Sequence, residues 1–124
     1  MVDIETVRRL ALALPEVEDS SGAKGLAFSV RGCKGFAWTF QERIHPKKPR
    51  VPKLEVLAVR CPLETKEMLI EAAPDRFFDD DHYRGFPAVL VRLEAIEADE
   101  LVGLLQGAWR ETAPKELARR LGPA

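Results

Sequence analysis

The stretch KLEVLAVRC, residues 53–61, carries apolar side chains on both faces of an extended chain. Leu54, Val56 and Ala58 fall on one face, whereas Leu57 and Val59 fall on the other. A strand with one solvated face alternates between apolar and polar residues, so this pattern indicates a strand that is covered on both sides. We therefore predict a β-sheet in which this stretch is a central strand.

Two shorter runs of β-favouring residues, GLAFSVRG and KGFAWTFQ, precede that strand and are separated by a glycine-bounded turn. Their alternation of apolar residues predicts a β-hairpin. The residues expected to share a face within each run are Leu26, Phe28 and Val30 in the first, and Phe36, Trp38 and Phe40 in the second. We interpret Trp38, together with Trp109 further along the chain, as core residues because each lies on an apolar face.

Helical spacing marks the beginning of the chain. Apolar residues recur every three or four positions from Asp3 to Leu14, Asp3 can cap the helix, and Pro15 disfavours its continuation. The next segment, PEVEDSSGAKG, is polar and small, and predicts a loop.

A second helix is expected between Pro62 and Pro74, because proline suits a first helical turn and also ends a helix. Its expected inner face is formed by Met68, Leu69 and Ala72. The apolar run PAVLVRLEAI is too short for a further helix and predicts a strand, with FFDD adding a brief strand before it.

The last part of the chain predicts a helix that starts near Ala98. Gly103 and Gly107 each cost this helix about 1 kcal/mol relative to alanine, and close packing against the sheet would explain both. Thr112 followed by Pro114 predicts a further helix start. The inward residues expected in that last helix are Leu117, Ala118 and Leu121, with Gly122 at its end.

The order of elements, α-β-β-β-α-β(β)-α-α, is typical of an α+β fold in which helices cover an antiparallel sheet as a two-layer sandwich. A chain of 124 residues with 46% hydrophobic content is large enough to bury one core without metal or disulfide support. We expect a single domain over residues 1–124. With helices on one layer only, Leu57 and Val59 would need cover from loops or from a second subunit.

Four stretches together resemble the MmcQ/YjbR-like family: AFSVRGCKGFAWTF, LEVLAVRCP, HYRGFPAVLVRL and the closing LLQGAWRETAPKELARRL. The resemblance extends over nearly the whole chain. It implies a compact α+β fold of the type also found in secretion chaperones, and a possible DNA-binding role through a "double wing" of two hairpins. The family is not known as an enzyme family. Relatives commonly carry a tryptophan where this chain reads GFPAV, so the tip of the second wing, near His82 to Pro87, is expected to differ in shape.

The charge balance limits which partners the whole molecule can attract. Nineteen lysines and arginines against twenty acidic residues give a formal net charge of −1, so any site for a polyanion must be a local patch. The sequence lacks a signal-like or membrane-spanning apolar run, which predicts a cytoplasmic protein without a membrane partner. Cys33 and Cys61 lack the spacing of a disulfide scaffold or a metal motif and are expected to be free thiols.

The stretch from Arg43 to Lys53 is the candidate patch, because it carries five positive charges over eleven residues and no acid. Phosphate contacts dominate nonspecific DNA binding, and the prolines of this stretch would hold it extended. The candidate nucleic-acid-binding residues are Arg43, Lys47, Lys48, Arg50 and Lys53, with Tyr83 and Arg84 at the tip of the second hairpin. Such a surface predicts weak, sequence-independent contact with DNA. The alternative is a solvated loop whose charges keep a hairpin edge unpaired.

Other functions find less support in the residues. The contiguous Asp79, Asp80, Asp81 and His82 point to alternating sides of an extended chain, so a solvated acidic turn is favoured over a metal site, and we expect no cofactor. A dyad of Cys33 and His82 is conceivable, but recognised catalytic motifs are absent and we expect no enzyme activity. A protein–protein interaction module or a homodimer remains the alternative to DNA binding.

Overall fold

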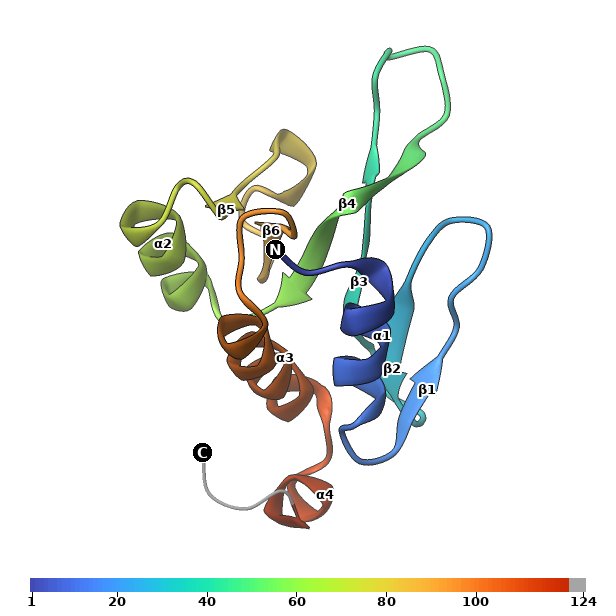
Figure 1. Cartoon of the computed structure of the whole chain (residues 1–124), viewed down its shortest axis with the longest axis vertical. Coiled ribbons are helices and arrows are strands. Elements are labelled where there is room, and N and C mark those ends of the chain that lie inside the picture. Colours follow the sequence, from blue (N-terminus) through green and yellow to red (C-terminus); the bar gives the residue numbers. More distant parts are fainter. Residues whose placement is uncertain (121–124) are drawn as a thin grey trace.

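The computed structural model describes residues 1–120, which form an α+β fold around a six-stranded sheet (Figure 1). Strand order is β1-β2-β3-β4-β6-β5, and every neighbouring pair is antiparallel. The strands are β1 (Val17–Asp19), β2 (Ala27–Val30), β3 (Gly35–Glu42), β4 (Val51–Arg60), β5 (Phe77–Phe78) and β6 (Ala88–Arg92). The helices are α1 (Ile4–Leu12), α2 (Leu63–Ala72), the 3₁₀ turn η1 (Asp81–Tyr83), α3 (Ala98–Thr112) and α4 (Lys115–Arg120). The predicted fold class is confirmed.

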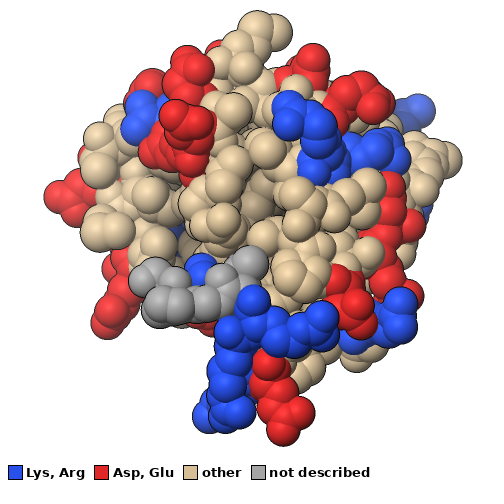
Figure 2. All heavy atoms as spheres, turned by 60° about the horizontal axis from the view of Figure 1, so that its bottom comes forward, with Lys and Arg blue, Asp and Glu red and all other residues tan. Residues whose placement is uncertain are grey.

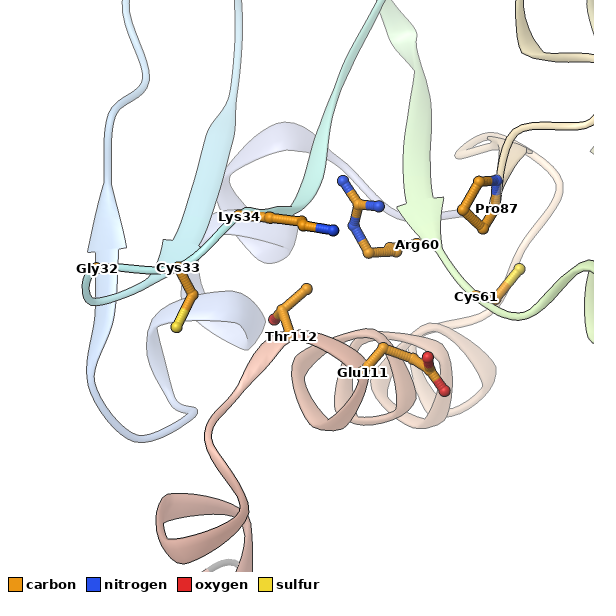
Figure 3. A pocket seen from close by; sticks show the side chains of 8 residues that line it. All are labelled: Gly32, Cys33, Lys34, Arg60, Cys61, Pro87, Glu111 and Thr112. Atoms are coloured by element: carbon orange, nitrogen blue, oxygen red, sulfur yellow. The ribbon is translucent and has the colours of Figure 1, made fainter.

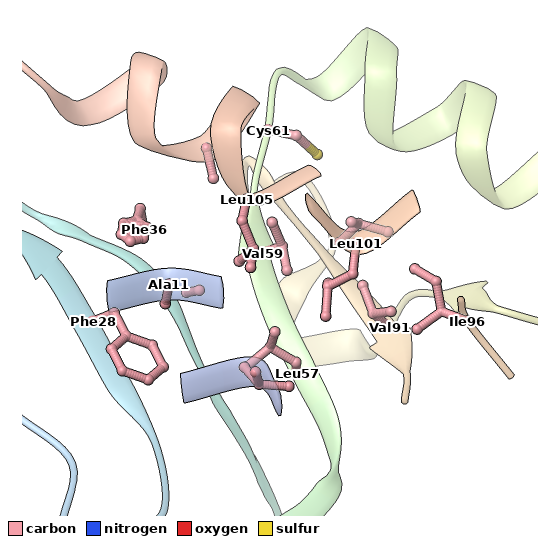
Figure 4. Packing of buried hydrophobic residues seen from close by; sticks show 14 of the residues in the cluster. Ala11, Phe28, Phe36, Leu57, Val59, Cys61, Val91, Ile96, Leu101 and Leu105 are labelled. Atoms are coloured by element: carbon pink, nitrogen blue, oxygen red, sulfur yellow. The ribbon is translucent and has the colours of Figure 1, made fainter. Parts of the chain in front are cut away.

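Helices α1 and α3 pack side by side on one face of the sheet, where the main core lies (Figure 4). The side chains of Ala11, Leu101 and Leu105 meet Leu57 and Val59 of β4 there. The N-terminal end of α1 is capped as expected, since the Asp3 carboxylate accepts a hydrogen bond of 2.8 Å from the Thr6 amide. Trp109 is fully buried in this core, as predicted, and its indole N–H donates to the Pro15 carbonyl at 2.9 Å.

Strand β4 is central and buried on both faces, as its sequence predicts. Leu57 and Val59 face the helices, so they need no cover from a second subunit. Val56 and Ala58 instead belong to a second, smaller core on the opposite face of the sheet. That second core is covered by Tyr83, which lies on the loop between β5 and β6.

The aromatic residues of β3 do not share one face, which corrects the predicted alternation. Phe36 points into the main core, whereas Trp38 and Phe40 belong to the second core. The pairing of β2 with β3 steps from Phe28↔Ala37 to Ser29↔Gly35, so Phe36 is an extra residue in the ladder. This β-bulge shifts the side-chain alternation by one position and sends the flanking aromatic rings to opposite faces.

Two local predictions are wrong at the edges of the fold. The segment predicted as a loop contains β1, a three-residue edge strand whose acidic residues are exposed, as edge strands often are. In α2 the side chains of Met68 and Ala72 are exposed, and the inner face is formed by Lys66, Leu69 and Ile70. A buried lysine breaks the apolar pattern on which the sequence prediction relied.

The glycines of α3 have a different environment from the one expected. A Cβ atom built on Gly103 or on Gly107 meets nothing within 4 Å, and both positions are exposed. Close packing against the sheet therefore does not explain them. Leu117 and Ala118 of α4 pack against the main core as predicted, whereas Leu121 and Gly122 lie outside the described residues.

Candidate nucleic-acid interface

The hairpin of β3 and β4 projects from the body of the molecule (Figure 1). Pairs such as Gln41↔Pro52 and Glu42↔Val51 join its two strands, while β2 and β6 pair only with the parts nearer the body. We refer to residues 41–54 as the arm. Within residues 1–120 the arm is thus a two-stranded ribbon without a neighbouring strand on either edge.

The tip of the arm is ordered by its own backbone. The Lys48 amide donates to the His45 carbonyl at 3.0 Å, and the Lys47 amide donates to Nδ1 of His45 at 3.2 Å. Residues 43–49 are all exposed. The sequence prediction of a proline-held basic loop that reaches solvent is therefore consistent with the position of this segment.

The five predicted cations of the arm fall into three groups. Lys47 and Lys48 are exposed and have no carboxylate within ion-pair distance in the described part of the chain. Arg43 and Arg50 each donate to a backbone carbonyl at 2.9 Å, of Pro46 and Gln41 respectively, so they keep their net charge. Lys53 lies 3.2 Å from the Glu42 carboxylate and is neutralised locally.

The second predicted tip, Tyr83 and Arg84, adds no unpaired cation to this patch within the described residues. Both belong to residues 79–87, which we call the acidic loop and which folds back against the sheet. Tyr83 is 7% exposed, and its hydroxyl accepts a 2.8 Å hydrogen bond from the Trp38 indole. Arg84 is exposed but lies 2.7 Å from the Asp81 carboxylate. Tyr83 is therefore a core residue, and Arg84 adds little net charge to the surface.

Lys66 is the buried cation that holds the acidic loop, and the sequence pattern missed it. Its ammonium donates to the carbonyl oxygens of Tyr83 at 2.6 Å and Phe86 at 3.0 Å, and it lies 2.9 Å from the Asp79 carboxylate. The side chain is only 3% exposed. A buried charge is tolerated when hydrogen bonds and an ion pair replace its water, as they do here.

Aromatic rings connect the acidic loop to β3. The rings of Phe40 and Phe86 each pack edge-to-face on Tyr83, with centroids 5.6 and 5.8 Å away. Burial raises the pKa of the Tyr83 phenol above its ordinary value, although the hydrogen bond from Trp38 acts in the opposite direction. Trp38 is only partly buried, so it is less of a core residue than predicted.

The carboxylates of the acidic loop are used within the fold. Asp79 binds Lys66, Asp80 accepts from the His82 amide at 2.9 Å, and Asp81 pairs with Arg84. The described residues contain no group of three or more histidine, cysteine and acidic side chains that could hold a metal ion. The observed contacts of these carboxylates are thus with groups of the protein itself.

The Cys61 thiol is not an activated nucleophile, and Cys33 does not pair with His82. Burial raises the pKa of the Cys61 thiol to about 11, which keeps it protonated near neutral pH. The Cys33 thiol donates weakly to the Arg31 carbonyl at 3.6 Å, whereas His82 packs its ring against Tyr83. The hypothetical dyad of Cys33 and His82 thus has no support in these contacts.

Charges of both signs are mixed at the end of the molecule that is remote from the arm (Figure 2). Figure 2 shows the end of the molecule opposite the arm, where basic and acidic side chains alternate around a neutral centre. The arm is accordingly a local cationic feature on a molecule with a net charge of −1.

None of the helices in residues 1–120 is long and apolar enough to cross a membrane.

Comparison with known proteins agrees with the resemblance found in the sequence. A sequence model of the family described as YjbR matches residues 12–111. Uncharacterized proteins of Mycobacterium bovis (Mb2600) and Mycobacterium tuberculosis (Rv2570) are each 41% identical to the chain over 69 residues. That match covers 55% of this chain and 54% of each relative, so the chain spans about half the length of the curated relatives it matches. The crystal structure of Deinococcus radiodurans protein DR2400, with a DUF419 domain, superposes with a TM-score of 0.66 at 20% identity. The superposition covers 100% of this chain and 91% of that one, and it supports the fold.

Proposed function

The chain belongs to the YjbR family, and we propose that it binds double-stranded DNA weakly and without base-sequence specificity through the arm. The observation that carries this proposal is the arm's unneutralised charge. Lys47 and Lys48 lack a carboxylate partner in the described chain. Arg43 and Arg50 donate hydrogen bonds to neutral backbone carbonyls, which leave their charge in place. Four positive charges are thus presented on one projecting ribbon.

The shape of the arm suits a duplex. A two-stranded β-ribbon fits the major groove of B-DNA, and its cationic side chains would lie near the phosphates that flank the groove. The exposed polar side chains of the tip are mainly cationic, and cations bind phosphates regardless of base sequence. Binding through the arm should therefore be sensitive to salt, because it depends on the release of condensed counterions.

A second candidate function is contact with another protein, favoured by apolar exposure on the same arm. Ile44 is 75% exposed, Leu54 is 51% exposed and Val51 is 41% exposed. The unpaired edges of the ribbon could add a strand from a partner or from a second copy of the chain. Sedimentation analysis over a range of protein concentrations tests self-association, and Ile44→Ser should abolish it if the arm is the contact.

The DNA proposal is tested by measuring the fluorescence anisotropy of a labelled duplex across a salt series. The variant Lys47→Glu, Lys48→Glu, Arg50→Glu should weaken binding by about 100-fold at low salt, because three phosphate contacts become repulsive. Two duplexes of unrelated sequence should bind with equal affinity.

A charge-matched control separates the arm from net charge. Arg9, Lys115 and Arg119 are exposed on helices away from the arm, and their reversal to glutamate changes the net charge by the same amount. This control should retain most of the affinity. If the control and the arm variant lose affinity equally, or if wild type and arm variant bind equally, the arm is not the DNA-binding surface.

A further inference from the structure

A polar hollow of ≈ 720 Å³ lies at the end of β4 that is remote from the arm (Figure 3). Its walls come from the turn between β2 and β3, the end of β4, the segment before β6 and the end of α3. Small-molecule sites in proteins are commonly between about 300 and 1,000 Å³. The hollow is therefore of a size that accommodates a small organic molecule.

Arg60 is held in a fixed position on the wall of this hollow. Its Nε donates to the Gly35 carbonyl at 2.9 Å, and its guanidinium carbon lies 5.4 Å from the ring centroids of both Trp38 and Phe86. These contacts orient the planar guanidinium and leave its two terminal nitrogens free of a carboxylate partner within residues 1–120. A guanidinium oriented in this way can bind both oxygens of a carboxylate or phosphate at little entropic cost.

Lys34 adds a second cation from the opposite side. Figure 3 shows its side chain extending towards the Arg60 guanidinium across the hollow. No ion pair involves Lys34 in the described chain, whereas Arg8, Arg76 and Lys66 each pair with an acidic residue. Two like charges directed at one space repel each other, and an oxyanion between them would turn that repulsion into two attractions.

The remaining walls restrict what can enter. Glu111 lies on the α3 side of the hollow, where its carboxylate disfavours a polyanion but can accept a hydrogen bond from a hydroxyl or amine. The Cys61 thiol lines the same space and is protonated near neutral pH, so it is not poised for attack on a ligand. The surroundings suit binding of a small molecule with a single anionic group.

We propose that this hollow binds a small organic molecule through one carboxylate or phosphate group, which lies between Lys34 and Arg60. The site is independent of the proposed DNA contact, because the arm lies at the other end of β4. It would give the protein a small-molecule ligand in addition to any nucleic acid.

The proposal is tested by amide chemical shifts in ¹⁵N-labelled protein, titrated with inorganic phosphate or with the monocarboxylate acetate at constant ionic strength. We expect saturable shifts at residues 32–34 and 60–61 with at least one of the two anions. Saturation by phosphate alone indicates a phosphate-bearing ligand, and saturation by acetate indicates a carboxylate-bearing one. Shifts that grow without saturation for both anions, or that are spread over the surface, would overturn the proposal.

Variants assign the binding to the two cations. Lys34→Glu should weaken the anion by about tenfold or more without altering DNA binding, because a charge-assisted contact becomes a repulsion. Lys24→Glu is the matched control, since Lys24 is also exposed but lies outside the hollow. Unchanged affinity in Lys34→Glu would contradict the proposal. Arg60→Gln, checked for folding by its amide spectrum, should reduce binding further than Lys34→Ala.

Discussion

The arm and the acidic loop are both charged connections between strands, but they differ in exposure and in the partners of their charged side chains. The arm extends into solvent, with Lys47 and Lys48 unpaired within residues 1–120. The acidic loop is folded onto the sheet, and its three aspartates contact Lys66, the His82 amide and Arg84. The charge of the arm is therefore exposed to solvent and to any partner, whereas the charges of the acidic loop are paired with groups of the protein itself.

The difference arises from what each loop can bury. The acidic loop carries Tyr83, which is buried in the second core beside Phe40, and Phe86, whose partly exposed ring packs edge-to-face on Trp38 and Tyr83. The tip of the arm offers prolines, cations and a single large apolar side chain, Ile44, so it has little apolar surface with which to fold back. Charge content alone therefore does not show which loop folds back onto the sheet, whereas the aromatic residues of the loop do.

The largest expected change in stability comes from Lys66. Lys66→Met leaves the Asp79 carboxylate and the carbonyls of Tyr83 and Phe86 without their shared donor. We expect a loss of about 3 kcal/mol in the free energy of unfolding, since removing one partner of a buried ion pair leaves its other groups unsatisfied. Urea denaturation monitored by circular dichroism measures this change.

Lys24→Met provides the control for that measurement, because Lys24 is exposed, and it should shift stability by less than about 0.5 kcal/mol. Lys66→Met should retain DNA binding under conditions in which it is folded, because the arm is untouched. Equal stabilities of the two variants would show that the acidic loop is not held by Lys66 and would remove the contrast with the arm.

Tyr83→Phe should have a smaller effect. It keeps the ring in the second core but removes the acceptor of the Trp38 indole N–H, which costs about 1 kcal/mol. Burial raises the folded-state pKa of this phenol above its unfolded value near 10. The stabilisation is therefore complete below the unfolded pKa and is lost as pH rises through the folded pKa.

Denaturation at neutral and at alkaline pH checks both statements. Tyr83→Phe should be less stable than wild type at neutral pH, and the difference should shrink as pH rises above about 10. A difference that stayed constant with pH would mean that the phenol ionises in the folded protein as readily as in the unfolded chain. Such a result would imply that the acidic loop opens at this position.

Patterns within one strand could be predicted from the sequence, whereas contacts between distant segments could not. The burial of β4 on both faces follows from Val56 to Val59 alone, and the cap at Asp3 is equally local. The bulge at Phe36 changes no residue type and shows only in the pairing with β2. Alternation therefore placed the aromatic residues of β3 on a single face, which the structure corrects.

The candidate site also contains features that depend on local sequence and features that depend on contacts between distant segments. The exposure of the tip of the arm follows from its prolines and charges, with Ile44 as its one large apolar side chain, so its cations were predictable. The burial of Tyr83 depends on Trp38, which is 45 residues away in sequence, and on Lys66, which is 17 residues away. A lysine on a helix predicts solvent exposure. Nothing in the sequence near Lys66 indicates that two backbone carbonyls and a carboxylate accept hydrogen bonds from its ammonium group.

Arg84→Gln tests the acidic loop at its surface and should have a still smaller effect. Arg84 and Asp81 are both largely exposed, so their ion pair is screened by water and contributes less than about 0.5 kcal/mol. DNA affinity at low salt should also stay close to that of wild type. A clear loss of affinity would mean that Arg84 exchanges Asp81 for a phosphate, and the acidic loop would then share the binding surface with the arm.

The double variant Lys47→Gln, Lys48→Gln is expected to leave stability unchanged, because neither side chain has a carboxylate partner in the part of the chain described. Its effect should be on binding alone. If both lysines contact phosphates, the slope of log affinity against log salt should decrease by about 2 in magnitude, since each contact releases about one counterion. Anisotropy measured at several salt concentrations gives the slope, and urea denaturation gives the stability. A loss of stability without a change in slope would mean that these lysines support the fold, as Lys66 does, and that the two loops do not differ in the way their geometry indicates.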